Sequence, residues 1–362
     1  MSDESVIAEL AVGQAEDLWS EQDTTPEHID SALRRLLHER HAQNQALAPA
    51  RVLNLVVLVD REWKGEIANR LSRVGRYHAS RTVLCAVEPR RTTLDAWAAM
   101  SYDTAGGEGS VMHEQVEIDL GEEHLARLDT IIDPVIISEL PTMMWSPHGH
   151  RDAVESMQRM IDVMLLDSDD GDGGADGFAY AAKMLETAYV VDLAWLRTTP
   201  WRERLASSFD PPDRRQALAQ VERIEIRHRE TTNTSALLLA GWLASRLGWK
   251  PEPLRQSGRA RLEGRVRAHK REIELLLEPG EQDVPGLRGV TVVSAGGFSL
   301  SLDRGPGGLQ ARESRDGQER TWQVLGASRG EGGILGEGVR QAHLRDPTYG
   351  PALEAARRFL PQ

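Results

Sequence analysis

Two kinds of apolar pattern alternate along the first two thirds of the chain. Residues 52–59 (VLNLVVLV) and 82–87 (TVLCAV) are nearly continuous apolar runs, which are typical of strands buried on both faces. Residues 66–74 between them have the spacing of an amphipathic helix. The same two patterns recur further on. They predict strands at 111–120, 140–145, 161–166 and 221–228, and helices at 122–137, 152–160, 178–189, 200–209 and 235–247. This alternation predicts an α/β fold with a mostly parallel, layered sheet.

Beyond residue 250 the pattern changes to short alternating runs joined by glycine turns. The dipeptide Gly296-Gly297 separates two such runs, and Asp316-Gly317 separates two more. Both dipeptides readily adopt the positive φ angles that tight hairpins require. We therefore expect a small antiparallel sheet, closed by a final helix with Asp346 as its cap and Pro347 at its first position.

The chain also opens with a predicted helix, in which Thr25 is the cap and Pro26 the first residue. The glycine-rich residues 105–110 and 326–338 are expected to form loops. These patterns predict three regions: an N-terminal helix and linker over 1–49, an α/β domain over 50–250, and a smaller β-rich domain with a C-terminal helix over 251–362.

Composition limits the classes of function. The 362 residues are 40% hydrophobic and 27% charged, as in globular proteins. The 43 Lys and Arg against 56 Asp and Glu give a net charge of −13, which argues against general nucleic-acid binding because phosphate neutralisation needs a basic surface. No apolar run approaches the roughly 20 residues of a membrane helix, and the first residues lack the pattern of a signal peptide. We expect a cytoplasmic protein that binds neither nucleic acid nor membranes.

Motifs for catalysis, cofactors and metals are weak or missing. The lone Cys85, in the middle of a predicted strand, excludes an internal disulfide and a multi-cysteine zinc site. No metal site is expected at His148 and His150, because a turn that begins at Pro147 accounts for the pair. After the first predicted strand, residues 60–65 (DREWKG) contain a single glycine, where a dinucleotide fingerprint has several. We predict no catalytic residue, no cofactor and no metal.

An alternation of arginines follows residue 258. In an extended strand, Arg259, Arg261, Arg265 and Arg267 would share one face. One interpretation is a solvated sheet face whose arginines pair with glutamates across strands. The other is a surface for an anion or an acidic partner.

Tryptophan is unusually frequent, with nine Trp against four Phe. Core packing is the ordinary role of any one Trp. However, residues 192–202 (DLAWLRTTPWR) combine Trp with Arg, the two residues that are enriched in the energetic centres of protein interfaces. Together with the lack of a catalytic motif, this pattern favours a binding protein over an enzyme.

Several of these segments resemble the glucose-6-phosphate dehydrogenase assembly proteins, the OpcA family. The resemblance is carried by residues 50–60, 78–89, 140–145, 192–210, 234–249 and 345–349 (RDPTY). One departure is Ala79, where the family more often has proline.

The resemblance implies a non-catalytic assembly factor and allosteric activator of glucose-6-phosphate dehydrogenase, the entry enzyme of the oxidative pentose phosphate pathway. The residues that it implies for partner binding are His78, Ser80, Arg81, Trp145, Trp195, Arg197, Trp201 and Arg202.

The alternative is a sensor or enzyme for sugar phosphates or nucleotides. Such a protein would use the crevice at the carboxyl ends of the parallel strands, near Asp60, Glu88 and Trp145.

Overall fold

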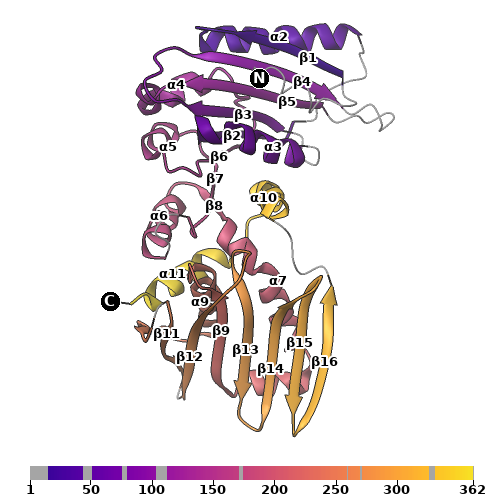
Figure 1. Cartoon of the computed structure of the whole chain (residues 1–362), viewed down its shortest axis with the longest axis vertical. Helices are drawn as coiled ribbons and strands as arrows, with labels where there is room; N and C mark the ends of the chain where they lie inside the picture. The colour runs from indigo at the N-terminus through magenta and orange to yellow at the C-terminus, as the bar shows by residue number, and fades with distance from the viewer. Residues whose placement is uncertain are drawn as a thin grey trace. The chain divides into compact units, whose positions relative to one another are not determined.

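The structure is a computed structural model that describes residues 15–43, 51–75, 80–102, 112–170, 174–258, 260–269, 271–325 and 331–361 (Figure 1). His78, Arg259 and residues 105–110 lie outside this part of the chain. The chain divides into two compact units, Met1–Leu165 and Leu166–Gln362. The domain boundary near residue 250 stays a prediction, whereas the division between the compact units falls between Leu165 and Leu166 in the sequence.

The first unit is built on a mostly parallel sheet. Its strands are β1 (Ala15–Glu21), β2 (Leu53–Asp60), β3 (Ser80–Val87), β4 (Asp95–Tyr102), β5 (Met112–Leu120), β6 (Thr142–Trp145) and β7 (Val163–Leu166). They lie in the order β1-β4-β5-β3-β2-β6-β7. The neighbouring strands β5, β3, β2, β6 and β7 all run parallel to one another. Strand β4 runs antiparallel to both of its neighbours, β1 and β5. The predicted α/β fold with a mostly parallel sheet is confirmed.

Helices connect the strands of this unit. They are α2 (Pro26–Gln43), η1 (Arg61–Trp63), α3 (Lys64–Gly75), η3 (Glu122–Arg127), α4 (Leu128–Ile132) and α5 (Arg151–Met157). The single helix predicted over 122–137 is wrong in extent, because a 3-10 turn precedes α4 and α4 ends at Ile132. Pro134 explains this end, since the residue before a proline is disfavoured in helical geometry.

The second unit contains a mixed sheet and most of the long helices. The helical segments are α6 (Ala175–Leu185), α7 (Leu193–Ser208), α8 (Pro212–Leu218), α9 (Thr234–Leu247), α10 (Glu331–Arg340), η4 (Gln341–His343) and α11 (Tyr349–Phe359). The strands are β8 (Tyr189–Asp192), β9 (Val221–Arg229), β10 (Arg255–Gln256), β11 (Leu262–Ala268), β12 (Arg271–Gly280), β13 (Leu287–Ser294), β14 (Phe298–Gly305), β15 (Gly308–Arg315) and β16 (Gln318–Leu325).

Strands β9 to β16 form the second sheet, in the order β10-β11-β12-β9-β13-β14-β15-β16. All neighbours are antiparallel except β12 and β9. Strand β9 was predicted in the α/β region but lies in the middle of this sheet. Both predicted hairpin turns are present: Gly296 and Gly297 have φ angles of 79° and 76°, and Asp316 and Gly317 have φ angles of 50° and 78°.

Helices α9 and α11 pack against each other at very short range (Figure 1). A Cβ at Gly241 of α9 would overlap the carbonyl oxygen of Ala352 in α11. Only glycine permits this approach of the two helix backbones. The apolar side of the second sheet therefore lies under a closely packed helix layer.

Three sequence predictions for this unit are corrected. Residues 326–338 were expected to be a loop, yet α10 covers Glu331–Arg340, because Ile334, Leu335 and Val339 supply a buried apolar stripe. Helix α7 begins at Leu193, earlier than the predicted residue 200, and contains Pro200 in its interior. Helix α11 begins at Tyr349, so Asp346 and Pro347 precede the helix. Asp346 instead accepts a hydrogen bond from the Thr348 backbone N–H through Oδ1 (2.8 Å).

No helix in the described part of the chain is long and apolar enough to cross a membrane.

Candidate functional site

A cavity of about 390 Å³ opens in the second unit beside the first half of α7. Strand β8 and α7 form one side of it, and η4 with the segment that leads to α11 forms the other. The residues that line it are Tyr189, Val190, Val191, Asp192, Trp195, Leu196, Thr199, Arg202, Glu203, Gln341, Leu344, Arg345, Asp346, Pro347 and Tyr349. The cavity thus joins segments that lie far apart in the sequence.

The core of the site is a stack of Arg202 on Trp195. These two residues are two turns apart on α7 and so lie on the same face, and the guanidinium carbon of Arg202 is 3.6 Å from the Trp195 ring centroid. The indole Nε1 of Trp195 donates to Asp346 Oδ2 (2.9 Å), which is also 3.6 Å from Arg202 Nη1. Arg202 donates to Thr198 Oγ1 and Thr199 Oγ1 as well (3.0 and 2.9 Å). Both side chains are therefore held in place before any ligand or partner arrives.

Burial changes the titration of the charged groups in this stack. Burial lowers the pKa of Arg202 to about 10, although Asp346 acts in the opposite direction. The guanidinium therefore remains charged at neutral pH. Burial alone would raise the pKa of Asp346, but hydrogen bonds from Thr348 and Trp195 and the charge of Arg202 hold it below its usual value. The stack is an intact ion pair at neutral pH.

The floor of the cavity is a hydrogen-bonded cluster around Asp192. Asp192 caps α7 by accepting from the Ala194 backbone N–H (3.0 Å), and it accepts from Ser168 Oγ (2.7 Å) and from the Tyr349 hydroxyl (2.8 Å). The Tyr349 ring packs 5.6 Å from the Trp195 ring. Burial, followed by the nearby charge of Asp167, raises the pKa of Asp192 to about 6. The floor links α7, α11 and the loop after β7.

The rim of the cavity is exposed and mixed in character. Leu344 is 52% exposed, one of the large apolar side chains left in solvent. The Arg345 guanidinium lies 5.8 Å from the Tyr189 ring centroid. The Tyr189 hydroxyl donates to the Leu344 carbonyl (3.0 Å) and accepts from the Asp346 N–H (2.8 Å). A rigid interior with an exposed leucine and arginine at its edge suits recognition better than proton transfer.

The structure places four of the predicted partner-binding residues on α7. Trp195 and Arg202 meet at the cavity, as described above. Arg197 lies on the same helix and binds Asp167 through two contacts (2.9 and 2.6 Å). Trp201 is 1% exposed and belongs to the core.

The other predicted partner-binding residues lie in the first unit. Ser80, Arg81 and Trp145 are 4%, 7% and 4% exposed. Arg81 donates to Glu114 Oε2 and to the Val135 carbonyl, both at 2.8 Å. Side chains so deeply buried offer little area to a partner in this conformation, and their docking role, like that of His78, stays a prediction.

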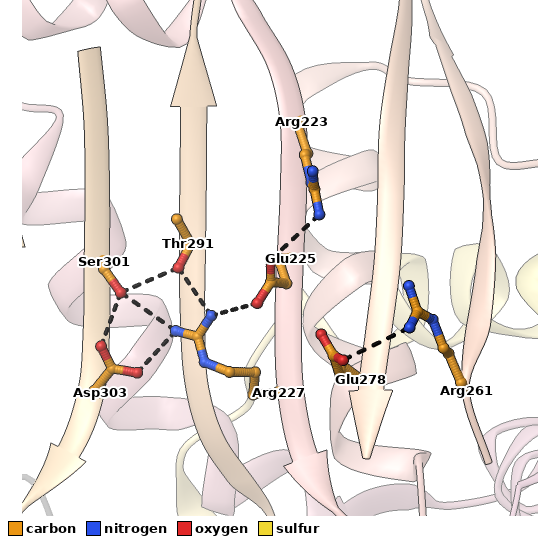
Figure 2. Close-up of polar contacts among 8 residues, drawn as sticks. All are labelled: Arg223, Glu225, Arg227, Arg261, Glu278, Thr291, Ser301 and Asp303. Carbon is orange, nitrogen blue, oxygen red and sulfur yellow. Dashed lines mark hydrogen bonds and ion pairs between the residues drawn. The ribbon is translucent and has the colours of Figure 1, made fainter. Parts of the chain in front are cut away.

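In the alternation of arginines over 259–267, each arginine that the structure describes faces a carboxylate. Arg261 lies 3.7 Å from Glu278 (Figure 2), Arg265 lies 2.7 Å from Glu272, and Arg267 lies 3.0 Å from Glu252. This is the arrangement expected of a solvated sheet face. The anion or acidic-partner surface that includes Arg259 stays a prediction.

The carboxyl ends of β2 and β6 in the first unit hold a second polar cluster. The Asp60 backbone N–H donates to His148 Nδ1 (2.9 Å), and His150 Nε2 is 2.9 Å from Asp60 Oδ1. An acidic side chain, Asp60, therefore does lie near the two histidines. Among the described residues, no group of three or more His, Cys, Asp or Glu side chains has the geometry to hold a metal ion.

Some residues of the cavity carried no sequence signal of their own. Tyr189 was placed in a predicted helix, and Leu344 and Gln341 had no motif. In the sequence, Tyr349 stands out only within RDPTY, and Asp346 only within RDPTY and as the predicted cap of the final helix. Only the tertiary structure brings RDPTY next to α7.

Two family models match this α/β protein. The first describes the C-terminal domain of a glucose-6-phosphate dehydrogenase subunit and matches residues 188–353. The second describes the N-terminal domain of that subunit and matches residues 71–182. Both are OpcA models, and together they cover most of the chain. The chain belongs to the OpcA family, which confirms the resemblance.

Curated relatives agree with this assignment. A protein of Synechococcus elongatus named OxPP cycle protein OpcA is 28% identical over 149 residues, which are 40% of this chain and 34% of that protein. A protein of the same name from Synechocystis sp. is 30% identical over 131 residues, 35% of this chain and 28% of that protein. The aligned part spans about a third of the length of these relatives.

A distant likeness to solved structures concerns the fold alone. KijD10, a 3-ketoreductase from Actinomadura kijaniata solved in complex with TDP-benzene and NADP, is 9% identical and superposes with a TM-score of 0.51. The superposition covers 86% of this chain and 95% of that one.

Proposed function

We propose that this protein is a non-catalytic assembly factor and allosteric activator of glucose-6-phosphate dehydrogenase, and that it docks through the rim of the cavity beside α7. The observation that carries this proposal is the meeting of two family-like segments, 192–210 and 345–349, at a single cavity. The names of the matching family models supply the partner.

The construction of the cavity supports a docking role. Trp195 and Arg202 are fixed by neighbouring side chains, so binding would cost little conformational entropy there. Leu344 and Arg345 lie at the rim, where they can contact another surface. A leucine and an arginine close to the aromatic rings of Trp195 and Tyr349 have the composition of an interface centre.

Activation by such docking is a shift between conformations of the dehydrogenase. If the rim binds the active, assembled form more tightly than the inactive form, the equilibrium moves by the difference between the two binding free energies. No reacting group from this chain is required.

The alternative function is a sugar-phosphate or nucleotide sensor or enzyme. A cavity of about 390 Å³ is large enough for a small molecule. The end of β2 and the turn after it argue against a dinucleotide enzyme, because Asp60 and Trp63 occupy the stretch where a glycine-rich phosphate loop would begin. A carboxylate at that place repels phosphate.

The test is a rate assay of the dehydrogenase from the same host, with and without this chain. We expect Leu344→Asp and Arg345→Glu each to weaken activation at least about tenfold, as the loss of an interface centre would. Leu18→Asp is the matched control, because Leu18 is a similarly exposed leucine (55%) of the first unit. If both rim variants activate fully, docking at the cavity is wrong. If the unmodified chain neither binds nor activates the dehydrogenase, the whole proposal is wrong.

A thermal-shift measurement distinguishes the sugar-phosphate or nucleotide sensor from the assembly factor. A sugar phosphate or nucleotide that binds the folded chain must raise its melting temperature without the dehydrogenase. Such a shift, lost in Arg202→Gln, would favour the sensor.

A further inference from the structure

The two faces of the second sheet have opposite characters. On β9, the side chains of Ile224 and Ile226 are buried, whereas Arg223, Glu225 and Arg227 alternate with them on the other face. The apolar face lies against helices, as the contact between the Phe298 and Phe209 rings near the end of α7 shows. The other face is here called the polar face. It consists of Arg223, Glu225 and Arg227 together with the residues in register with them on β11 to β16.

A hydrogen-bonded network makes the centre of the polar face rigid. Arg227 donates to Glu225 Oε1 (2.8 Å), Asp303 Oδ1 (2.8 Å), Thr291 Oγ1 (3.0 Å) and Ser301 Oγ (3.3 Å). Figure 2 shows this guanidinium lying along the sheet between β9 and the two strands beside it, with helices behind them. The Arg227 side chain is only 20% exposed although it lies on an outer face. A surface so fully bonded within itself is prepared to meet another without reorganising.

The middle of the polar face is also flat. Gly289, Thr291 and Val293 of β13 lie beside Ser299 and Ser301 of β14. These short side chains project little, and the long charged ones next to them lie across the sheet in ion pairs. Such a surface fits a second flat surface.

The charges of the polar face select the kind of partner. The face carries both signs in an interspersed pattern and is close to neutral within a chain of net charge −13. A strongly charged partner gains nothing there, whereas a second copy, with the same net charge of −13, meets little repulsion at a face of mixed charge. The charged members are Arg223, Arg227, Arg265, Arg267 and Arg312, and Glu225, Glu263, Glu272, Glu274, Glu278, Asp303 and Glu319.

A two-fold axis would make these charges complementary. Arg223 and Glu225 follow each other on the same face of β9. An axis that passes between them places each arginine opposite the glutamate of the other copy. This axis makes the central Arg223 and Glu225 pair complementary between the two copies.

The polar face has the area of a stable interface. The sheet runs from β11 through β9 to β16, with strands of roughly eight residues. With strands about 4.8 Å apart and a rise of about 3.3 Å per residue, the face measures roughly 30 by 26 Å, or about 800 Å². A stable protein interface buries about 800 Å² on each partner.

We propose that the polar face is the interface through which two copies of this chain form a two-fold symmetric dimer. The interface is isologous, because the same residues contribute from both copies. The dimer does not depend on the proposed function, since it forms from this chain alone.

The experiment is sedimentation velocity of the purified chain over a wide range of concentrations. We expect a species of twice the chain mass of 40.2 kDa. Val293→Asp should raise the dimer dissociation constant at least about tenfold, because each interface then buries two additional carboxylates. Val284→Asp is the matched control: Val284 is 44% exposed and lies in the loop between β12 and β13, so this variant should dimerise normally.

Ser299→Arg is a second test of the same face, needed if Val293→Asp does not fold. It adds a long charged side chain to the same face without touching the core, and circular dichroism shows whether each variant is folded. A chain that sediments as a monomer at every concentration overturns the proposal. So does a dimer that both folded variants leave intact. If the chain is a monomer and Val293→Asp abolishes activation of the dehydrogenase, the face binds that enzyme instead.

Discussion

The central strands of the two sheets differ in how many faces they bury. In β2 of the first unit, the residues Leu53–Val59 are buried without a break, and only Asp60 at the end of the strand is partly exposed. In β9 of the second unit, buried and partly exposed residues alternate from Arg223 to the end. Both strands have sheet neighbours on either side. The difference shows that hydrophobic periodicity reports how many faces a sheet has covered, and not how central a strand is.

The largest expected effect tests this difference directly. Val56 and Val57 point to opposite faces of β2 and are both 0% exposed. We expect Val56→Lys and Val57→Lys each to lower the free energy of unfolding by about 5 kcal/mol or more, since each buries an unpaired charge.

In β9 and its neighbour the effect should depend on the face. Ile226→Lys should be as harmful as the changes in β2, whereas Glu274→Lys, on the polar face and 60% exposed, should cost no more than about 1 kcal/mol, although it sets a lysine beside Arg223 and Arg265. Urea denaturation, monitored by circular dichroism, measures the free energy of unfolding of the two β2 variants and of the two variants in the second sheet. Equal effects of Val56→Lys and Glu274→Lys would contradict the comparison.

The next effect concerns carboxylates. In the first unit, Glu114 is fully buried between Arg51 and Arg81. Glu114→Gln should cost about 3–5 kcal/mol, because it leaves buried arginines without a counter-charge. In the second unit, Asp303 meets Arg227 at 47% exposure, and Asp303→Asn should cost less than about 1 kcal/mol. The same denaturation assay ranks the two. A reversed ranking would contradict the comparison between the two units.

The pH dependence of stability sharpens the contrast between paired and unpaired buried acids. Asp192 accepts its hydrogen bonds from neutral donors, and burial raises its pKa to about 6 from an ordinary value of 3.8. Between these two values the native chain holds a proton that the unfolded chain has released. The free energy of unfolding therefore falls as the pH rises through this window, by roughly 3 kcal/mol in total.

Asp192→Asn serves as the control for this slope. The variant lacks the titrating group, so its unfolding free energy should change less across the window between the two pKa values. A parallel slope in both proteins would show that another group causes it.

The smallest expected effect compares two glycines. Gly317, in the hairpin between β15 and β16, has a φ angle of 78°, and Gly317→Ala should destabilise by about 1 kcal/mol. Gly65 in α3 has open space around its Cα and ordinary helical geometry, so Gly65→Ala should stabilise by up to about 1 kcal/mol. Thermal unfolding distinguishes the signs.

Local patterns predicted most of the helices and strands, but not the strands that lack an apolar pattern of their own. The strands β2 and β3 and both glycine hairpins follow from short-range sequence signals, and all are present. The strands β1 and β4 were missed, because β1 (AEDLWSE) is polar and β4 (DAWAAMSY) is rich in alanine. Their strand state depends on pairing with each other and with β5, which no local window contains.

The candidate site was predicted only in part. The Trp and Arg content of 192–202 predicts a partner-binding role for Trp195 and Arg202. In the sequence, RDPTY is a separate segment with no visible relation to them. Which tryptophans would line a cavity and which would be core was not visible, since Trp195 and Trp201 have the same chemistry and differ in the direction they take from α7. Burial of Trp201 and the Asp346 bond of Trp195 separate them.

Periodicity, turn residues and charge balance are properties of neighbouring positions, and from them the chain alone determined an α/β first region, glycine hairpins and an acidic, globular character. Packing decided the rest. The meeting of α7 with the residues before α11, the placement of β9 in the second sheet and the neutral polar face all join positions far apart in sequence. Long-range contacts of this kind are selected by the free energy of the whole fold, which no single segment contains.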